Sequence, residues 1–168
     1  MENKMHYITQ YHSPLGDILL AADERGLIGL WFEGQKYYAN GLAPNPVKQT
    51  TPILTQTKQW LDQYFAGQLP LSMPPIHMTG TPFQLTVWEI LQTIPYGKTT
   101  TYKEIAKTIA AQKGLPHMSA QAVGGAVGHN KISILIPCHR VVGTNGSLTG
   151  YAGGIDKKIK LLTLEKAE

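Results

Sequence analysis

Three prolines within residues 69–80, LPLSMPPIHMTG, divide the chain into halves with different hydrophobic patterns. Proline fixes φ and lacks a backbone N–H, so such a stretch neither continues a helix nor fills the middle of a sheet. We interpret it as a linker or as a passage along a sheet edge. The chain has 168 residues, which is enough for two small domains. We predict these domains at residues 1–78 and 79–168.

The first half predicts a small antiparallel sheet followed by one helix. Its apolar runs alternate or lie between turn sequences, as strands do. Strands are expected at residues 5–12, 17–22 and 27–32. Residues 33–50 are rich in Gly, Pro and Asn and predict irregular structure. Thr51 and Pro52 suit the cap and the first position of a helix, which Gly67 ends.

The second half predicts a mostly helical domain. Helices are expected after the caps Thr81, Thr101 and Ser119, the third of them over residues 121–130. This third helix is built from Ala, Val and Gly, so it can approach a neighbouring helix or a ligand closely. A short helix pair of this kind is also typical of a helix-turn-helix, whose second helix enters a DNA groove. Asp156 is expected to cap a final helix.

Charge is distributed unevenly along the chain. Residues 1–79 carry five Lys/Arg and six Asp/Glu, whereas residues 80–168 carry ten and five. A polyanionic partner for the second half fits this imbalance, but on charge alone a solvated basic surface is the favoured explanation. No apolar run approaches the roughly 18 residues of a membrane helix, and no signal pattern opens the sequence. We expect a cytoplasmic monomer without a membrane partner.

Cys138 is the only cysteine, within the run ILIPCHRVV at residues 134–142. Four interpretations are open: an inert buried thiol, a metal ligand, the nucleophile of a cysteine hydrolase, and a thiolate that attacks an alkyl carbon. A structural zinc needs about four ligands, and the chain has no second thiol, so we expect no metal. The general base of a hydrolase would come from a distant histidine, and no context singles one out.

The neighbours of Cys138 favour an activated thiolate. Adjacent cations lower a thiol pKa from its usual value of about 8.5, and His139 and Arg140 follow directly. Pro137 stiffens the segment, and we expect an extended backbone over residues 132–142. In an extended strand His139 points away from the sulfur, so it would take the thiol proton through one water. A carboxylate behind His139 would hold its tautomer, but local sequence does not identify that carboxylate.

The tetrapeptide Pro137-Cys138-His139-Arg140 resembles the active-site signature of the O6-alkylguanine-DNA alkyltransferases, or methylated-DNA–protein-cysteine methyltransferases. Three more segments fit that family in order: FQLTVWEILQTIPYGKTTTYKEIA (83–106), QAVGGAVGHN (121–130), and GSLTGYAGG with the tail that contains Glu165. The resemblance implies an α+β fold. Its N-terminal part would be a small antiparallel sheet with a helix, ribonuclease H-like. Its C-terminal part would be a mostly α winged helix-turn-helix DNA-binding domain.

The family resemblance also implies an activity, that of a methylated-DNA–[protein]-cysteine S-methyltransferase used for DNA repair. Such a protein flips an alkylated guanine out of duplex DNA and moves the O6-alkyl group irreversibly onto Cys138, once per molecule. O4-alkylthymine is a further candidate substrate. The implied partner is double-stranded DNA that contains O6-alkylguanine, and no cofactor is implied.

Residue roles follow from the same resemblance. Cys138 matches the nucleophile, His139 the water-relayed base, and Glu165 the carboxylate that holds the histidine. Asn130 matches the brace before the active-site strand, and Tyr102 the tyrosine that crowds the 3′ phosphate and donates at guanine N3. Base-pocket walls are implied at Tyr102, Val141, Tyr151, Ala152 and Gly153. DNA contacts are expected at Ser119, Gln121, Ala122, Gly124 and Arg140.

This chain departs from the family pattern at three places. The family often has arginine where Gln121 stands; glutamine can fill the gap left by the flipped base but offers no cation and weaker stacking. Some members have serine where Ala152 stands, and a contact through the backbone N–H would survive that change. About five extra residues around 111–118 lengthen the turn before Gln121.

Overall fold

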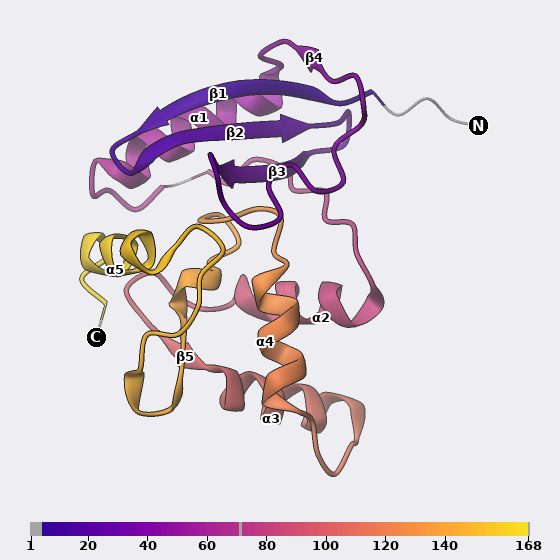
Figure 1. Cartoon of the computed structure of the whole chain (residues 1–168), viewed down its shortest axis with the longest axis vertical. Helices are drawn as coiled ribbons and strands as arrows, with labels where there is room; N and C mark the ends of the chain where they lie inside the picture. Colours follow the sequence, from indigo (N-terminus) through magenta and orange to yellow (C-terminus); the bar gives the residue numbers. More distant parts are fainter. Residues whose placement is uncertain (1–4, 71, 168) are drawn as a thin grey trace. The chain divides into compact units, whose positions relative to one another are not determined.

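The structure is a computed structural model that describes residues 5–70 and 72–167. Close contacts divide the chain into two compact units, residues 1–79 and 80–168, one residue from the expected boundary. The elements of both units are labelled in Figure 1. Within the described ranges, no helix is both long and apolar enough to cross a membrane.

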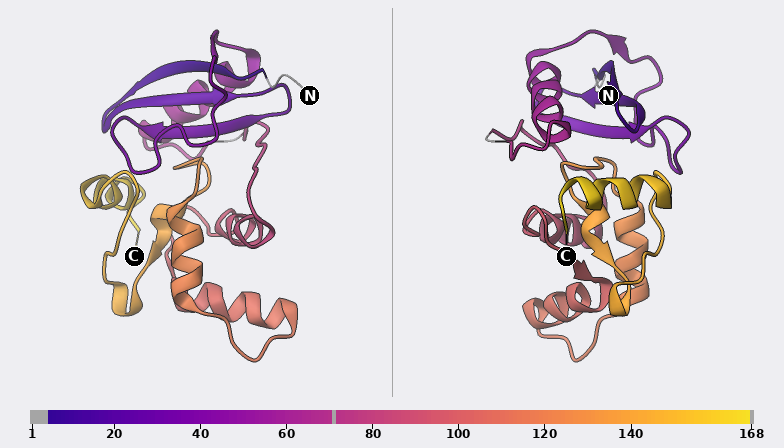
Figure 2. Two further views of the ribbon diagram at one scale, coloured as in Figure 1. Left: turned by 45° about the vertical axis from the view of Figure 1, so that its right-hand side comes forward. Right: turned by 90° about the vertical axis from the view of Figure 1, so that its left-hand side faces the viewer.

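The first unit contains a four-stranded sheet with the order β3-β2-β1-β4. Strands β1 (Tyr7–Ser13), β2 (Gly16–Ala22) and β3 (Leu27–Phe32) form the predicted antiparallel meander. The short strand β4 (Val47–Lys48) pairs in parallel with β1, inside the stretch expected to be irregular. Helix α1 (Pro52–Phe65) covers one face of the sheet (Figure 2) and buries Leu54, Trp60, Leu61 and Tyr64.

The proline-rich stretch runs along the edge of β3 in the first unit. Ile76 forms a parallel bridge with Leu27, whose backbone N–H donates to the Pro75 carbonyl at 2.8 Å. A Cβ on Gly26 would stand 2.7 Å from that same carbonyl, so the close approach requires glycine. Of the two interpretations of this stretch, the edge passage holds for residues 75–77.

The second unit packs three helices against one another: α2 (Pro82–Leu91), α3 (Tyr102–Lys113) and α4 (Ala120–Gly128). The predicted caps Thr81, Thr101 and Ser119 each accept a hydrogen bond from a backbone N–H of the first helical turn. Trp88 on α2 donates its indole N–H to the Ala126 carbonyl of α4 at 2.9 Å. This bond links the two helices in a core that contains Leu91, Ile105, Ile109 and Val123.

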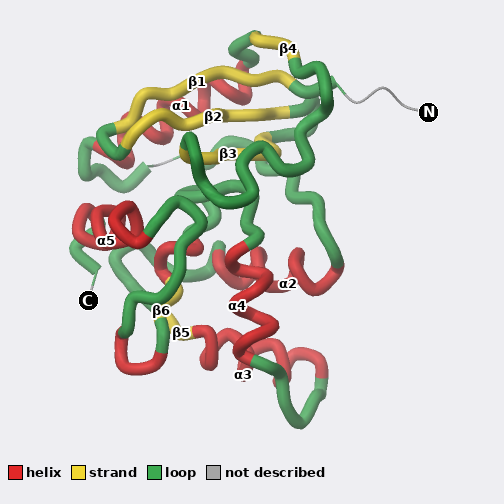
Figure 3. The backbone as a smooth tube through the Cα atoms, viewed as in Figure 1, coloured by secondary structure: helices red, strands yellow, loops and turns green. Residues whose placement is uncertain are grey.

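The segment after α4 differs from the prediction. Residues 132–142 are buried but not extended: turns lead into a 3-10 helix, η1 (Cys138–Arg140), and only β6 (Val141–Val142) is a strand. The turn sequence Thr144-Asn145-Gly146 predicts a hairpin between residues 140–143 and 147–150. Strand β6 pairs instead in parallel with β5 (Thr100–Thr101). The predicted turn at residues 144–146 exists as a short 3-10 helix, η2 (Thr144–Gly146), within a loop (Figure 3).

The final helix, α5 (Ile155–Leu164), begins two residues earlier than a cap at Asp156 would place it. Gly154, at φ 103°, occupies the cap position, and Asp156 lies inside the first turn. A cap residue must leave the helical backbone conformation, and glycine adopts this positive φ without the strain that a Cβ would bring. The acidic side chain still stands at the favourable end of the helix dipole.

We predict that Trp88→Phe lowers the free energy of unfolding by about 1 kcal/mol, because it removes a buried hydrogen bond and leaves the Ala126 carbonyl with only the His129 N–H at 3.2 Å. Urea denaturation followed by circular dichroism would measure the change. Trp60→Phe is the control, since it removes the same atoms from a ring that stacks on Tyr64 at 5.3 Å. Equal losses in both variants would contradict a contribution from the indole hydrogen bond.

Candidate active site

Asn130 braces the turn that leads to the cysteine. Its side-chain Nδ2 donates to the carbonyls of Ile132 at 3.3 Å and Ile136 at 2.8 Å, while its Oδ1 accepts from the Ile132 N–H at 3.0 Å. Inside this turn Ile134 has φ 71°, a left-handed conformation that a β-branched residue rarely adopts. The side-chain bonds of Asn130 close the turn on both sides of the strained residue. In the structure, the bracing position expected for Asn130 therefore consists of these three side-chain hydrogen bonds to the backbone of the turn.

Cys138 stands at the start of η1 and is 5% exposed. Burial raises the pKa of its thiol, while hydrogen bonds from Asn130 and Ser133 and the charge of Lys158 act in the opposite direction. The resting side chain is therefore a thiol at neutral pH, and a nucleophilic thiolate requires that its proton be taken up elsewhere.

Glu165, the residue after α5, holds both basic neighbours of the cysteine. Its Oε2 lies 2.6 Å from Nε2 of His139, and its Oε1 accepts from Nε of Arg140 at 2.8 Å. A second guanidinium nitrogen donates to Oε2 at 3.1 Å, and the backbone N–H of Gly97 donates to Oε1 at 3.2 Å. All three side chains are buried. The carboxylate inferred behind His139 is therefore Glu165.

The imidazole of His139 has one nitrogen bonded and one open. Because a carboxylate only accepts, Nε2 carries the proton and Nδ1 keeps its lone pair. Among the described residues Nδ1 has no hydrogen-bond partner, although it is buried. Burial lowers the pKa of His139, and Glu165 opposes this effect only in part. His139 is thus a neutral base with a free acceptor nitrogen.

Arg140 was expected to contact DNA, but its guanidinium has other partners. Besides its two bonds to Glu165, it donates to the Ile94 carbonyl at 2.8 Å, and it lies over the Tyr96 ring at 5.7 Å. The side chain is 10% exposed. These bonds direct the guanidinium toward Glu165, and the expected DNA contact of Arg140 stays a prediction. We therefore assign Arg140 to the support of Glu165.

Lys158 on α5 was not singled out from the sequence. It is completely buried, and its Nζ donates to the carbonyls of Val141 at 2.6 Å and Thr149 at 2.7 Å. Its neighbour on α5, the apolar Ile159, is 42% exposed. A signal was available: Lys158 stands three residues before Leu161 and seven before Glu165, the spacing of one helix face.

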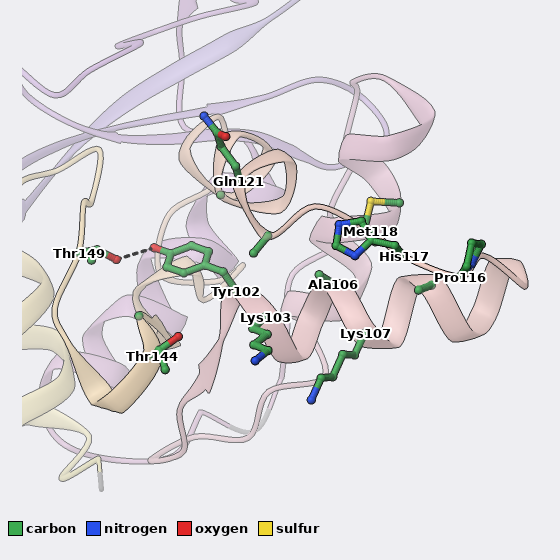
Figure 4. A pocket seen from close by; sticks show the side chains of 14 residues that line it. Tyr102, Lys103, Ala106, Lys107, Pro116, His117, Met118, Gln121, Thr144 and Thr149 are labelled. Atoms are coloured by element: carbon green, nitrogen blue, oxygen red, sulfur yellow. Dashed lines mark hydrogen bonds between the residues drawn. The ribbon is translucent and has the colours of Figure 1, made fainter.

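Tyr102 and Gln121 meet at a pocket of about 790 Å³ on the second unit (Figure 4). Tyr102 begins α3, and its hydroxyl accepts a hydrogen bond from Thr149 at 3.4 Å. Gln121 is the second residue of α4 and is exposed. The other lining residues are Lys103, Ala106, Lys107, Ala110, Pro116, His117, Met118, Ala120, Gly124, Gly143, Thr144 and Thr149. The lengthened turn before α4 therefore forms part of the wall.

The remaining predicted base-pocket residues are not among those that line this pocket. Val141 is fully buried in β6, and Ala152 and Gly153 form a half-buried turn before α5. Burial, with a smaller contribution from the nearby Cys138, raises the pKa of Tyr151 well above its ordinary value. Of the predicted DNA contacts, Ser119, Gln121 and Ala122 are exposed at the start of α4 and Gly124 is half-buried. The described residues contain no group of three His, Cys, Asp or Glu side chains placed to hold a metal ion.

Two family models together match nearly the whole chain. Residues 82–167 match the DNA binding domain of 6-O-methylguanine DNA methyltransferase. Residues 6–74 match the ribonuclease-like domain of the same family. Both the helix-turn-helix unit and the small N-terminal sheet with its helix are thus family features.

Proteins that carry this family's name resemble the chain over almost their full length. The methylated-DNA–protein-cysteine methyltransferase of Methanosarcina acetivorans is 43% identical over 160 residues, which are 95% of this chain and 97% of that protein. The constitutive enzyme of Bacillus subtilis is 37% identical over 164 residues, 96% of both chains. A crystal structure of Mycobacterium tuberculosis OGT in complex with DNA is 40% identical, covers 95% of this chain and 92% of its own, and superposes with a TM-score of 0.82. The chain therefore belongs to the 6-O-methylguanine DNA methyltransferase family.

Proposed function

We propose that the chain repairs DNA by moving the alkyl group of O6-alkylguanine irreversibly onto Cys138, once per molecule. The observation that carries this proposal is the buried array in which the single cysteine stands next to a neutral His139, with Glu165 on the far side of the imidazole. An array of this kind can deprotonate a thiol and hold the resulting charges.

The first step is removal of the thiol proton. Nδ1 of His139 is open, and we propose that one water carries the proton from Cys138 to it. The imidazolium that forms faces Glu165 at 2.6 Å, so its charge has a partner before the proton arrives. Arg140 keeps Glu165 in place during this step.

The second step is attack of the thiolate on the alkyl carbon. A sulfur–carbon bond forms, the bond from that carbon to O6 breaks, and its electron pair returns to the base. The base becomes neutral guanine by taking a proton, for which Tyr102 is the donor at N3 in this proposal. The phenolate of Tyr102 then regains a proton through solvent, in exchange for the one that His139 took from Cys138, so protons and charges balance. Burial raises the pKa of Tyr102, so its hydroxyl keeps its proton until the base needs it. The alkyl group moves from substrate to thioether, and no cofactor enters the balance.

Base flipping is required because O6 lies inside the stacked duplex. We propose that α4 approaches a groove and that Gln121 fills the space left by the flipped base, with Tyr102 turning the adjacent phosphate. Val141 and the turn at residues 151–153 would form the walls around the base. Duplex DNA with O6-alkylguanine is the proposed partner, and O4-alkylthymine is a second candidate substrate.

We propose that the chain acts as a monomer in a reducing, cytoplasmic compartment. The reaction consumes a free thiol, and cytosolic conditions keep a lone cysteine in that form. One chain carries one Cys138, so one molecule suffices for one lesion.

The central prediction concerns stoichiometry. Incubation with duplex DNA that bears a labelled O6-methylguanine should transfer one label per protein molecule, because the thioether does not turn over. Cys138→Ala should abolish the transfer while it leaves DNA binding intact. Several turnovers per molecule, as in a hydrolase, or binding without label, as in a non-catalytic reader of damage, would contradict the proposal.

A second prediction tests Gln121 as the wedge, that is, as the side chain that fills the space left by the flipped base. Gln121→Ala should slow repair of alkylated duplex DNA about fivefold, the equivalent of one hydrogen bond of about 1 kcal/mol, and Gln121→Arg should accelerate it. Transfer from the free alkylated base should change in neither variant, since no flipping is needed there. If neither substitution alters repair of duplex DNA, Gln121 is not the wedge.

A third prediction follows from the neutral state of His139. Its pKa is lowered in the folded protein, so between about pH 6.5 and that lower value only the unfolded chain binds the proton. Above this pH window, His139 therefore contributes nothing to the pH dependence of the free energy of unfolding. Within it, stability falls as pH falls, by up to about 1.4 kcal/mol per pH unit. Unfolding free energies of the unmodified protein and His139→Gln should diverge in slope only below about pH 6.5; parallel curves there would show that His139 is not held neutral.

A further inference from the structure

Lys158 is a buried cation to which the proposed mechanism gives no task. Its Nζ projects from α5 and donates to three backbone carbonyls, those of Val141 at 2.6 Å, Thr149 at 2.7 Å and Gly150 at 3.4 Å. The three carbonyls satisfy the donors of the ammonium, but they do not neutralise its charge. Burial of an ammonium without a counter-ion is expensive, and it lowers the pKa of Lys158 accordingly.

No carboxylate of the described chain forms an ion pair with Lys158. The nearby carboxylate, Glu165, is engaged by His139, Arg140 and the Gly97 N–H. Lys158 instead lies beside the turn of the nucleophile: its Nζ donates to the Val141 carbonyl at 2.6 Å, and the Val141 N–H donates in turn to the Cys138 carbonyl. Cys138 can become an anion, and its charge would act on Lys158. The same pair is coupled from the other side, since Lys158 is the cation that favours the thiolate form of Cys138.

The charges created by proton transfer fit this arrangement. When the proton passes from Cys138 to His139, one negative and one positive charge arise in a buried region. The imidazolium faces Glu165, which lies on one side of η1. Lys158 and Arg140 both disfavour an imidazolium, so neither can serve as its partner. The thiolate needs a cation, and Lys158 is the one not already paired with a carboxylate.

We propose that Lys158 is a positioning residue that acts as the resident counter-ion of the Cys138 thiolate, and that it holds the carbonyls before the base-binding turn in register with β6. This inference rests on the proposed alkyl transfer and adds a group to it. Thr149 and Gly150 immediately precede the turn at residues 151–153, so the same ammonium ties the base pocket to the strand that follows the nucleophile.

Thiol reactivity tests the counter-ion role without DNA. Iodoacetamide alkylates thiolates, and with one cysteine in the chain the modified residue is always Cys138. We expect Lys158→Met to react at least tenfold more slowly than the unmodified protein at pH 7. Its rate–pH profile should shift upward by one pH unit or more, and the two rates should converge at high pH. Tyr102 and Tyr151, which interact with Cys138, have raised pKa values, and the neighbouring His139 has a lowered pKa, so all three stay neutral near pH 7 before the thiol ionises.

Three further variants separate charge from structure. Lys158→Gln keeps hydrogen-bond donors without the charge and should show the same shift as Lys158→Met. Lys158→Arg keeps the charge and should retain a profile close to that of the unmodified protein. Lys160→Met removes an exposed lysine two residues away and should change nothing. If Lys158→Met does not fold, the difference between the rate–pH profiles of Lys158→Gln and Lys158→Arg shows whether the charge of Lys158 matters.

A rate that falls equally at every pH would assign Lys158 a purely structural role and overturn the proposal, as would profiles that superimpose. Failure of the proposed function has a different signature. In that case the unmodified protein would take no label from O6-methylguanine in DNA, whatever the iodoacetamide profiles show.

Discussion

The carboxylate of Glu165 is the interaction on which the second unit depends. It receives His139, Arg140 and the Gly97 N–H at once, and so joins α5, η1 and the turn after α2. A buried ion pair of this kind is weak evidence for stability, since well-packed apolar residues often do as well. Its retention is better explained by what it does to the imidazole. The fixed carboxylate sets the tautomer of His139 and prepares a site for the charge that His139 acquires.

The turn before the cysteine shows how the chain delivers a nucleophile into the interior. An extended strand would have placed Cys138 and His139 on opposite faces. The 3-10 helix η1 instead turns the chain by about a third of a circle per residue, so both side chains remain buried at one site. The strained Ile134 lies just upstream, and Asn130 holds the turn closed around it. Strain of about 1–3 kcal/mol persists at such positions when side-chain bonds over-determine the backbone, as they do here.

Sequence was sufficient for those parts of the structure in which local rules and packing agree. Caps at Thr81, Thr101 and Ser119 and the meander of β1 to β3 follow from short-range chemistry. The buried run after α4 could not be resolved in this way, because a continuous apolar pattern fits a strand and a buried coil equally. What decides between them is the side chain of Asn130, whose bonds to residues two and six positions away become visible only in the fold.

The pairing of charges was also beyond the sequence. His139 and Arg140 next to Cys138 suggested two cations that activate the thiol, yet the structure commits both to Glu165, and we propose Lys158, twenty residues later, as the cation for the thiolate. In this arrangement the thiol stays protonated and unreactive until a base accepts its proton. A buried thiol with a raised pKa resists incidental oxidation and alkylation, which act on thiolates. For a protein that can react only once, a nucleophile that stays protonated until a base accepts its proton is worth more than one that is permanently ionised. The groups that create the thiolate must then be in place before the substrate binds. Glu165 holds His139 in position to accept the proton, and Lys158 is the proposed cation for the thiolate.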